Sequence, residues 1–194
     1  EDAPFVDPMC GAGTFPIEAA MIAANIAPGM DRSFTAEEWE NLIPKKEWYA
    51  AITEAEDMVD RHLLETKENR FGKMVDIQGY DIDPAMIPVC RENAERAGVL
   101  SLIHFQERDI AKMSHGKKHG VLMTNPPYGE RIEDKRNLPL LYTELREAYE
   151  GLNDWQLFVI TAYEHAEKYL GKSFKNRKIY NGMMKTYLYQ YKGK

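Results

Sequence analysis

Several features that mark other classes of protein are scarce or absent in this sequence. Only Cys10 and Cys90 occur among 194 residues, which argues against a disulfide scaffold and predicts a reducing, cytoplasmic compartment. No apolar run approaches the roughly 18 residues of a membrane-spanning helix. No group of cysteines and histidines has zinc-ligand spacing. We therefore expect a globular chain with no membrane and no metal partner.

An excess of positive charge is also missing. The formal net charge is −6, which argues against nucleic-acid binding over the whole surface. The charge is nevertheless uneven, because acids dominate residues 37–68 whereas residues 168–194 contain none. The basic residues of that last segment are Lys168, Lys172, Lys175, Arg177, Lys178, Lys185, Lys192 and Lys194. They form either a solvated face or a patch that contacts phosphates, and the sequence leaves both interpretations open.

What the sequence does contain is a proline-rich turn, residues 124–129, which reads Thr-Asn-Pro-Pro-Tyr-Gly. It follows an apolar run, residues 120–123, that predicts a buried strand. The two prolines prevent further strand pairing and force a rigid turn just beyond the strand. Open parallel sheets bind their ligands at that edge. The turn presents the Asn125 amide, backbone carbonyls and the Tyr128 ring, a set suited to holding a planar amino group.

A second candidate binding segment lies near the start of the chain. Residues 4–7 predict a strand, and residues 7–14 form a glycine-containing turn into a helix expected over 15–26. Glycines at such a turn let the backbone approach a ligand without a Cβ clash. A G-x-G sequence between a strand and a helix, preceded by Asp7, indicates a loop that binds a nucleoside cofactor.

Acids follow the next two predicted strands. Asp81 ends the second strand, where a carboxylate can accept hydrogen bonds from ribose hydroxyls, and Asp109 follows the third. Asp83 is expected to cap the helix that comes next and runs to about residue 97. The separation between the glycine loop and Asp81 exceeds the usual spacing of about 20 residues. A helical insertion at about residues 30–70 accounts for the excess.

The order of predicted elements indicates an α/β fold. Strands alternate with helices, which predicts a doubly wound, mostly parallel sheet, and Asn181-Gly182 predicts an antiparallel hairpin near the C-terminus. The strands are expected at residues 4–7, 75–81, 102–105, 120–123, 155–162, 173–180 and 183–191.

Three helices are predicted besides those that follow the first strands, and the last of them is short, over residues 164–170. Residues 46–67 predict one long charged helix with a buried stripe formed by Trp48, Ile52, Ala55, Val59 and Leu63. A charged loop is expected over 130–137, followed by a helix over 139–151 whose inward side chains are Leu141, Leu145 and Ala148.

This order of motifs resembles the class I S-adenosylmethionine-dependent methyltransferases, a Rossmann-like family. Residues 7–14 resemble its first motif, which wraps the methionine end of the cofactor, and residues 81–84 resemble the acidic second motif, which holds the ribose. Residues 109–110 resemble the third motif, beside the adenine, and residues 125–128 resemble the motif of amino-methyltransferases. The resemblance implies S-adenosyl-L-methionine as cofactor, bound by Asp7, Pro8, Gly11, Gly13, Thr14, Asp81, Ile82, Asp83, Asp109, Ile110 and Asn125.

A narrower resemblance rests on three segments: DPMCGAGTFPIEAAMIAANIAPG, RSF followed by W, and NPPYGERI. They are similar to segments of the bacterial guanine-N2 methyltransferases of large-subunit ribosomal RNA, often labelled N6-adenine-specific DNA methylases. In that family an RNA-binding THUMP domain precedes the catalytic domain. We therefore expect residues 1–194 to form a single catalytic domain, the C-terminal part of a longer protein, with 23S ribosomal RNA as its partner.

The expected catalytic residues are Asn125, Pro126 and Tyr128. The Asn125 side-chain oxygen and the Pro126 carbonyl can accept hydrogen bonds from an exocyclic amine, more strongly as positive charge develops on its nitrogen. Tyr128 can stack on a flipped base. Guanine N2, adenine N6 in DNA or RNA, and the side-chain amide of a release-factor glutamine all remain open as acceptors. A cofactor-binding scaffold without activity is a further alternative, and the intact Asn125 and Tyr128 argue against it.

Overall fold

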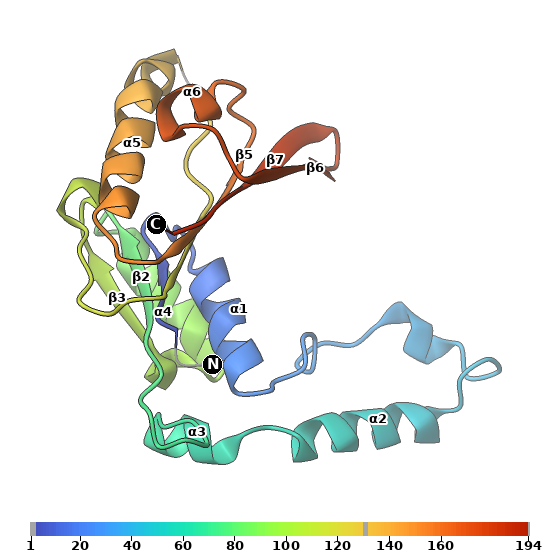
Figure 1. Cartoon of the computed structure of the whole chain (residues 1–194). Coiled ribbons are helices and arrows are strands. Elements are labelled where there is room, and N and C mark those ends of the chain that lie inside the picture. The colour runs from blue at the N-terminus through green and yellow to red at the C-terminus, as the bar shows by residue number, and fades with distance from the viewer. Residues whose placement is uncertain (1–2, 130–131, 194) are drawn as a thin grey trace.

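The fold is a seven-stranded mixed sheet with helices on both faces (Figure 1). A computed structural model describes residues 3–129 and 132–193. The strands are β1 (Phe5–Asp7), β2 (Ile77–Asp81), β3 (Ile103–Glu107), β4 (Val121–Thr124), β5 (Gln156–Thr161), β6 (Lys175–Asn181) and β7 (Met184–Tyr191), in the order β3-β2-β1-β4-β5-β7-β6. Strands β1 to β5 are parallel, and β7 runs antiparallel to both β5 and β6. The predicted doubly wound sheet with an antiparallel C-terminal hairpin is therefore confirmed.

Two apolar clusters hold the helices against the two faces of the sheet. Helices α1 (Thr14–Ala23) and α4 (Met86–Arg96) cover one face, where Ala20, Cys90 and Phe105 are buried. Helices α5 (Ile132–Glu150) and α6 (Ala166–Leu170) cover the other, where Tyr142 and Trp155 are fully buried. Short 3-10 helices connect these elements: η1 (Thr35–Glu38), η2 (Leu100–Leu102) and η3 (Ile110–Lys112). Within the described part of the chain, every helix is too short or too polar to cross a membrane.

Strand β1 is the point at which the strand order reverses. It pairs with β2 on one side and with β4 on the other. The chain therefore builds the sheet outward in one direction through β3 and then in the other direction through β4 and β5. A crevice opens at such a reversal beyond the carboxyl ends of the strands, and it is the usual ligand site of open α/β sheets.

The β6–β7 hairpin extends past the carboxyl ends of the parallel strands, and Figure 1 shows it projecting from the body. The register fixes this, because the last residue of β5, Thr161, pairs with Tyr187, and the hairpin continues beyond that pair. Asn181 pairs with Met184, so the two-residue loop is Gly182-Met183, one residue later than the Asn-Gly signal predicts. The positive φ of 60° at Gly182 is the conformation that glycine adopts readily.

The insertion differs from the sequence prediction. One long helix is expected over 46–67, but the structure has two, α2 (Lys45–Asp57) and α3 (Arg61–Thr66). Of the predicted buried stripe only Leu63 is buried, and α2, described along its whole length, has no buried residue. The physical reason is visible in Figure 1: α2 lies on an arm that projects away from the sheet. Its apolar side meets only other residues of that arm, as where the Trp48 and Phe34 rings stack 6.3 Å apart, and these contacts leave it at most partly buried. Helical periodicity predicts an apolar face but not what covers it.

The segment after the proline-rich turn also differs. Part of the predicted charged loop over 130–137 is helical, because α5 begins at Ile132 and contains Pro139. Residues 130–131 lie outside the described residues. The buried side chains of α5 include Leu138, Tyr142 and Leu145, whereas the predicted Leu141 and Ala148 are only partly buried.

Candidate functional site

A cavity of about 430 Å³ lies at the carboxyl edge of the sheet, at the reversal between β1 and β4. It is lined by Pro8, Met9, Gly11, Asp81, Ile82, Arg108, Asp109, Ile110, Asn125, Pro127, Leu141 and Glu144. These residues come from the loops after β1, β2, β3 and β4 and from α5. The cavity therefore joins the glycine loop, the acids and the proline-rich turn that the sequence singles out separately.

The two glycines of the β1–α1 loop have different surroundings. Both have positive φ, 51° at Gly11 and 87° at Gly13. A Cβ on Gly13 would lie 3.3 Å from Cys90, Ile17 and Phe105, so Gly13 permits close packing of the loop on the core. Apart from Gly11 and its two chain neighbours, no described residue has an atom within 4 Å of a Cβ placed on Gly11, which lines the cavity. Gly11 is therefore the glycine at which a ligand can approach the backbone.

Asp81 connects the first two loops of the site. Its Oδ2 accepts a hydrogen bond from the backbone N–H of Gly11 at 2.9 Å, and its Oδ1 accepts one from the N–H of Asp83, also at 2.9 Å. A carboxylate has about four acceptor positions, so this one keeps capacity for ligand hydroxyls. The sequence gives no sign of this structural role.

The neighbouring acids Asp83 and Asp109 also accept backbone hydrogen bonds. Asp83 accepts from the N–H of Ala85 at 2.9 Å, and α4 begins only at Met86, later than the predicted cap requires. Asp109 caps η3 by accepting from Ala111 at 3.0 Å. All three loop acids therefore shape the edge of the sheet before any ligand binds.

Asp7 lies beneath the cavity at the end of β1 and is only 2% exposed. Burial raises its pKa to about 7, against the lowering effect of the hydrogen bond from the Met9 N–H, 3.1 Å away. The neighbouring Thr124 hydroxyl also lowers that pKa, but it is buried and makes no hydrogen bond of normal geometry within the described residues. We therefore regard Met9 as the main partner of the carboxylate. A bound cationic group would compensate for this burial.

The proline-rich turn brings an amide oxygen to the cavity. Asn125 is exposed and lines the cavity, whereas Pro126 is buried. The half-buried Tyr128 donates its hydroxyl hydrogen to the Asn125 side-chain oxygen. An amide oxygen has two lone pairs, so one remains for a substrate donor. Tyr128 thus orients Asn125, a contact that the sequence does not predict.

The predicted site residues fall into two groups. Pro8, Gly11, Asp81, Ile82, Asp109, Ile110 and Asn125 line the cavity. Asp7, Gly13, Thr14, Asp83, Pro126 and Tyr128 surround or support it without lining it. Residues that the sequence analysis missed are Met9, Arg108, Pro127, Leu141 and Glu144. Arg108 directly precedes Asp109, and this position beyond a strand is the one signal that pointed to it.

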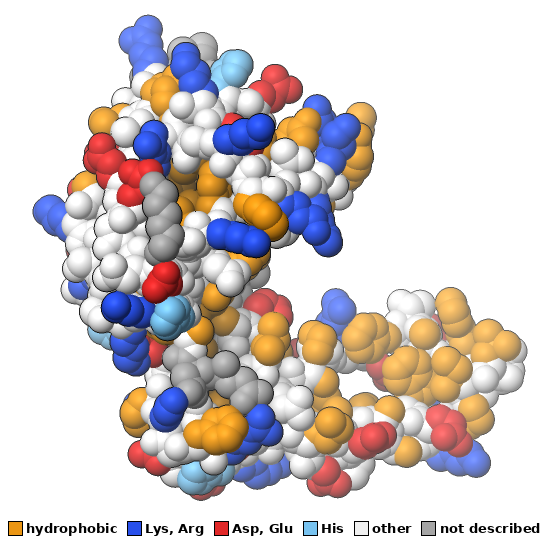
Figure 2. Space-filling view, in the orientation of Figure 1, with side chains coloured by type: hydrophobic (Ala, Val, Ile, Leu, Met, Phe, Trp, Pro, Cys, Tyr) orange, Lys and Arg blue, Asp and Glu red, His pale blue; other side chains and the backbone are white. Residues whose placement is uncertain are grey.

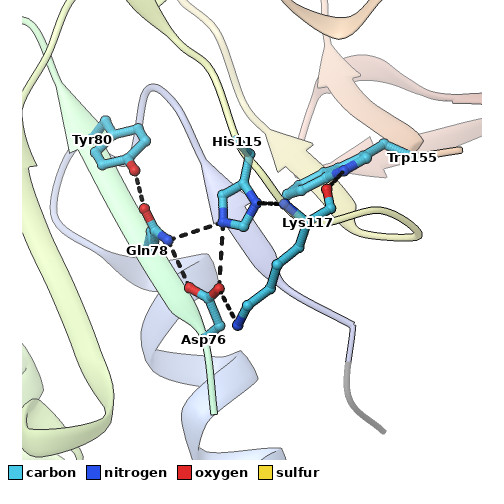
Figure 3. Close-up of polar contacts among 6 residues, drawn as sticks. All are labelled: Asp76, Gln78, Tyr80, His115, Lys117 and Trp155. Atoms are coloured by element: carbon cyan, nitrogen blue, oxygen red, sulfur yellow. Dashed lines mark hydrogen bonds and ion pairs between the residues drawn. The ribbon is translucent and has the colours of Figure 1, made fainter. Parts of the chain in front are cut away.

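A separate polar network lies at the opposite end of β2 (Figure 3). Asp76 accepts from the Gln78 amide at 2.6 Å and pairs with Lys117 at 2.7 Å. Burial alone would raise the pKa of Asp76, but these two partners hold it below its ordinary value. His115 lies 3.4 Å from Asp76, and its side chain is only 9% exposed, so it is part of this network and is largely shielded from solvent. Within the described residues no group of histidine, cysteine and acids is arranged to bind a metal.

The Gln78 of this network connects it to the floor of the cavity. The Tyr80 hydroxyl donates to the Gln78 side-chain oxygen. The guanidinium carbon of Arg108, a cavity residue, lies 4.5 Å from the centre of the Tyr80 ring. The Trp155 indole donates to the Lys117 carbonyl at 2.9 Å and thereby ties the network to β5. The network therefore links β2 to β5 at the end of the sheet opposite the cavity, and it supports Arg108 through the Tyr80 ring.

Together, a parallel sheet that reverses at β1, a glycine loop, acids after β2 and β3, and an Asn-Pro-Pro-Tyr turn after β4 define the fold of class I S-adenosylmethionine-dependent methyltransferases. The family UPF0020, described as RMKL-like, methyltransferase domain, matches residues 1–190. The chain belongs to this family. The resemblance inferred from the motifs is confirmed.

The names of the relatives that the chain matches also describe methyltransferases. The chain is 40% identical over 191 residues to the "Putative RNA methyltransferase YpsC" of Bacillus subtilis, covering 98% of this chain and 47% of that protein. It is 41% identical over 143 residues to the "Ribosomal RNA large subunit methyltransferase K/L" of Vibrio parahaemolyticus, covering 72% of this chain and 19% of that protein. The chain therefore spans about half of the first relative and less of the second.

Solved structures show the same fold. "A possible methylase" from Clostridium difficile 630 superposes with a TM-score of 0.88 at 43% identity, over 99% of this chain and 48% of that one. SMU.472, "a putative methyltransferase complexed with SAH", superposes with a TM-score of 0.86 at 38% identity, over 100% of this chain and 48% of that one.

Proposed function

We propose that this domain transfers the methyl group of S-adenosyl-L-methionine to an exocyclic amine of a nucleobase in RNA, and that the amine is guanine N2 in 23S ribosomal RNA. The observation that carries the proposal is the position of Asn125, whose amide lies at the rim of the cavity that Gly11, Asp81 and Asp109 also line. The names of the ribosomal RNA methyltransferase relatives support the substrate class.

The cavity residues suit this cofactor. The open backbone at Gly11 leaves room for a ligand to approach, and Asp7 and the loop acids provide negative charge beside it. We assign the methionine end to Asp7, Pro8, Gly11, Gly13 and Thr14, the ribose to Asp81, Ile82 and Asp83, and the adenine to Asp109 and Ile110. When bound, the cofactor supplies an already activated sulfonium methyl group, so the protein's contribution is positioning.

The acceptor chemistry falls to Asn125, Pro126 and Tyr128. An exocyclic amine is a poor nucleophile because its lone pair is delocalised into the ring. In this proposal the Asn125 oxygen and the Pro126 carbonyl accept its two N–H groups and aim the lone pair at the methyl group. These hydrogen bonds strengthen as positive charge develops on the nitrogen, which stabilises the transition state. The ring of Tyr128 stacks on the base while its hydroxyl holds Asn125.

Nucleoside mass spectrometry tests the proposal. RNA and DNA from cells with and without the gene are digested to nucleosides and compared, and release factors from the same cells are digested to peptides and compared in the same way. Loss of N2-methylguanosine from 23S ribosomal RNA, restored by the intact gene, is the expected result. Unchanged N2-methylguanosine with loss of N6-methyladenine, or loss of methylglutamine from a release factor, would replace guanine with that acceptor.

A further inference from the structure

Tyrosines gather beside the proline-rich turn in a pattern that the cavity does not explain. The Tyr142 and Tyr163 rings lie 5.1 Å apart, and Tyr163 and Tyr169 stack at 6.3 Å with an interplanar angle of 10°. Tyr163 follows the end of β5, and β5 is the neighbour of β4, whose continuation is the proline-rich turn. Tyr142 is fully buried, but Tyr163 and Tyr169 are only partly buried. Part of these rings is therefore available to a ligand near Tyr128.

Further tyrosines lie on one face of the hairpin, where Tyr187 packs against the same apolar cluster as Tyr163 and Tyr169. Residues paired directly across two antiparallel strands lie on the same face. Lys178 pairs with Tyr187, and Tyr180 pairs with Lys185. These four side chains therefore share a face. On this face Tyr187 packs against the buried apolar cluster that α5 and α6 cover. Tyr180 is 66% exposed.

Three of these rings, those of Tyr169, Tyr180 and Tyr187, each have a lysine ammonium group near one face. The ammonium nitrogens of Lys168, Lys178 and Lys185 lie 5.4, 6.0 and 5.0 Å from the centres of the Tyr169, Tyr180 and Tyr187 rings. The other face of the hairpin differs, since it carries Lys175 and Arg177 with Ile179 and Met184 but no aromatic ring. We call the row of Tyr163, Tyr169, Tyr180 and Tyr187 with its three lysines the tyrosine–lysine tract.

The tract lies beside the edge of the sheet that carries Asn125. The hairpin overhangs the carboxyl edge of the sheet, and this edge holds Asn125. Figure 2 shows Lys and Arg side chains gathered on the projecting hairpin. Sites that bind single strands combine aromatic rings with positive charges, because bases stack on the rings while cations contact the phosphates. Duplex RNA hides its base faces and cannot stack on these rings.

We propose that the tyrosine–lysine tract binds the unpaired nucleotides next to the nucleotide whose base reaches Asn125. Two or more flanking bases stack on the exposed rings, and Lys168, Lys178 and Lys185 contact the intervening phosphates. The proposal rests on the proposed function, because it takes the acceptor to be a base in RNA. It adds that the RNA must be single-stranded on the side of the hairpin.

Fluorescence anisotropy of the 194-residue chain with a labelled oligouridylate of about 12 nucleotides tests this. The parent is expected to bind the oligouridylate more tightly than a duplex RNA of equal length. Tyr180→Ala should weaken binding about 5- to 150-fold, the range for loss of one stacked base, while Tyr180→Phe keeps the parent affinity. Since Tyr180 is exposed, its replacement does not threaten the fold, and Tyr187→Phe against Tyr187→Leu repeats the comparison at a packed position.

The hairpin also supplies a matched charge control. Lys178→Ala with Lys185→Ala should lower the slope of log affinity against log salt by about 1.4, the value for two single-strand phosphate contacts. Lys175→Ala with Arg177→Ala removes the same charge from the opposite face and should change the slope much less. Equal effects of the two pairs, or unchanged affinity of Tyr180→Ala, would overturn the tract.

Binding and methylation separate the two proposals. The oligonucleotide needs no methyl transfer to bind. If the chain binds it through the tract but the gene leaves N2-methylguanosine unchanged, the tract stands and the proposed acceptor fails. If methylation is confirmed but the tyrosine variants bind as the parent does, the tract fails alone.

Discussion

The two halves of the sheet's carboxyl edge use different chemistry. On the β1–β3 half, hydrogen bonds between backbone amides and carboxylates fix the loops to one another, as Asp81 does for Gly11 and Asp83. On the β4–β7 half, aromatic rings and lysines are exposed together with Glu164, and residues 168–194 contain no acid. The first arrangement suits a small ligand of constant shape, whereas the second suits a flexible polyanion. Asn125 lies at the boundary between them.

The largest effect expected from one substitution is at that boundary. Asn125→Ala removes an acceptor that strengthens in the transition state, so single-turnover methyl transfer at saturating cofactor should slow by roughly 10²–10³-fold. Cofactor affinity, measured by calorimetry, should change little. Asn137→Ala, at an exposed position of α5, is the matched control. Full activity of Asn125→Ala would contradict the mechanism in which the Asn125 oxygen holds the acceptor amine.

Substitution of Asp7 tests whether a carboxyl that we assign to the cofactor lowers the free energy of unfolding of the free chain. Burial raises the pKa of Asp7 from 3.8 to about 7. Below 3.8 the carboxyl is protonated in both states, but between 3.8 and about 7 the unfolded chain ionises first, which disfavours the fold as pH rises. Asp7→Asn should therefore raise the free energy of unfolding at pH 8 by up to about 4 kcal/mol and leave it unchanged near pH 3.

Urea unfolding across this pH range measures how Asp7→Asn changes the free energy of unfolding. Calorimetry measures how the same substitution changes cofactor affinity. Asn keeps an oxygen that can accept the Met9 hydrogen bond but has no negative charge for a cationic ligand group. Cofactor affinity should fall while the free chain becomes more stable. Equal stability of parent and variant at pH 8 would show that the buried charge costs nothing.

Asp81→Ala should act on the β1–β3 half alone. It removes the contacts to Gly11 and Asp83 together with the proposed ribose contact, a loss of about 1.5–3 kcal/mol in cofactor affinity. Asp83→Ala is the comparison variant, because it removes another proposed ribose contact but keeps both backbone contacts of Asp81, and its effect should be milder. Oligonucleotide binding without cofactor should be unchanged in both. A parallel loss of RNA affinity would contradict the division into halves.

Much of the fold follows from the sequence, because strand periodicity and turn residues are local signals. The five parallel strands, the hairpin and the acids beyond the strand ends are all recognisable in this way. The failures concern partners distant in the chain. The apolar stripe of α2 lies away from the sheet and is at most partly buried, and the stripe of α5 is set by where that helix starts.

The candidate site shows the same limit. Sequence motifs brought Gly11, Asp81, Asp109 and Asn125 to attention, and all four line the cavity. They do not reveal that Asp81 binds the Gly11 amide, since that contact spans 70 positions. Composition does not separate the two faces of the hairpin either. Strand alternation places Arg177 and Lys178 on opposite faces, but only the register shows that Lys178 pairs with Tyr187 and Tyr180 with Lys185.

The smallest expected effect concerns the hydroxyl of Tyr128, where the two halves meet. The sequence suggests only stacking, for which Phe would serve as well as Tyr, but the structure adds a hydrogen bond from this hydroxyl to Asn125. Tyr128→Phe should therefore slow single-turnover methyl transfer about 2- to 10-fold, the equivalent of one net hydrogen bond, with RNA affinity unchanged. Tyr128→Ala should also weaken RNA binding, because the stacking surface is lost. Tyr180→Phe, which removes a hydroxyl from an exposed ring, is the control. Parent-like turnover of Tyr128→Phe would leave stacking as the only role of Tyr128 and place the orientation of Asn125 in the proline-rich backbone instead.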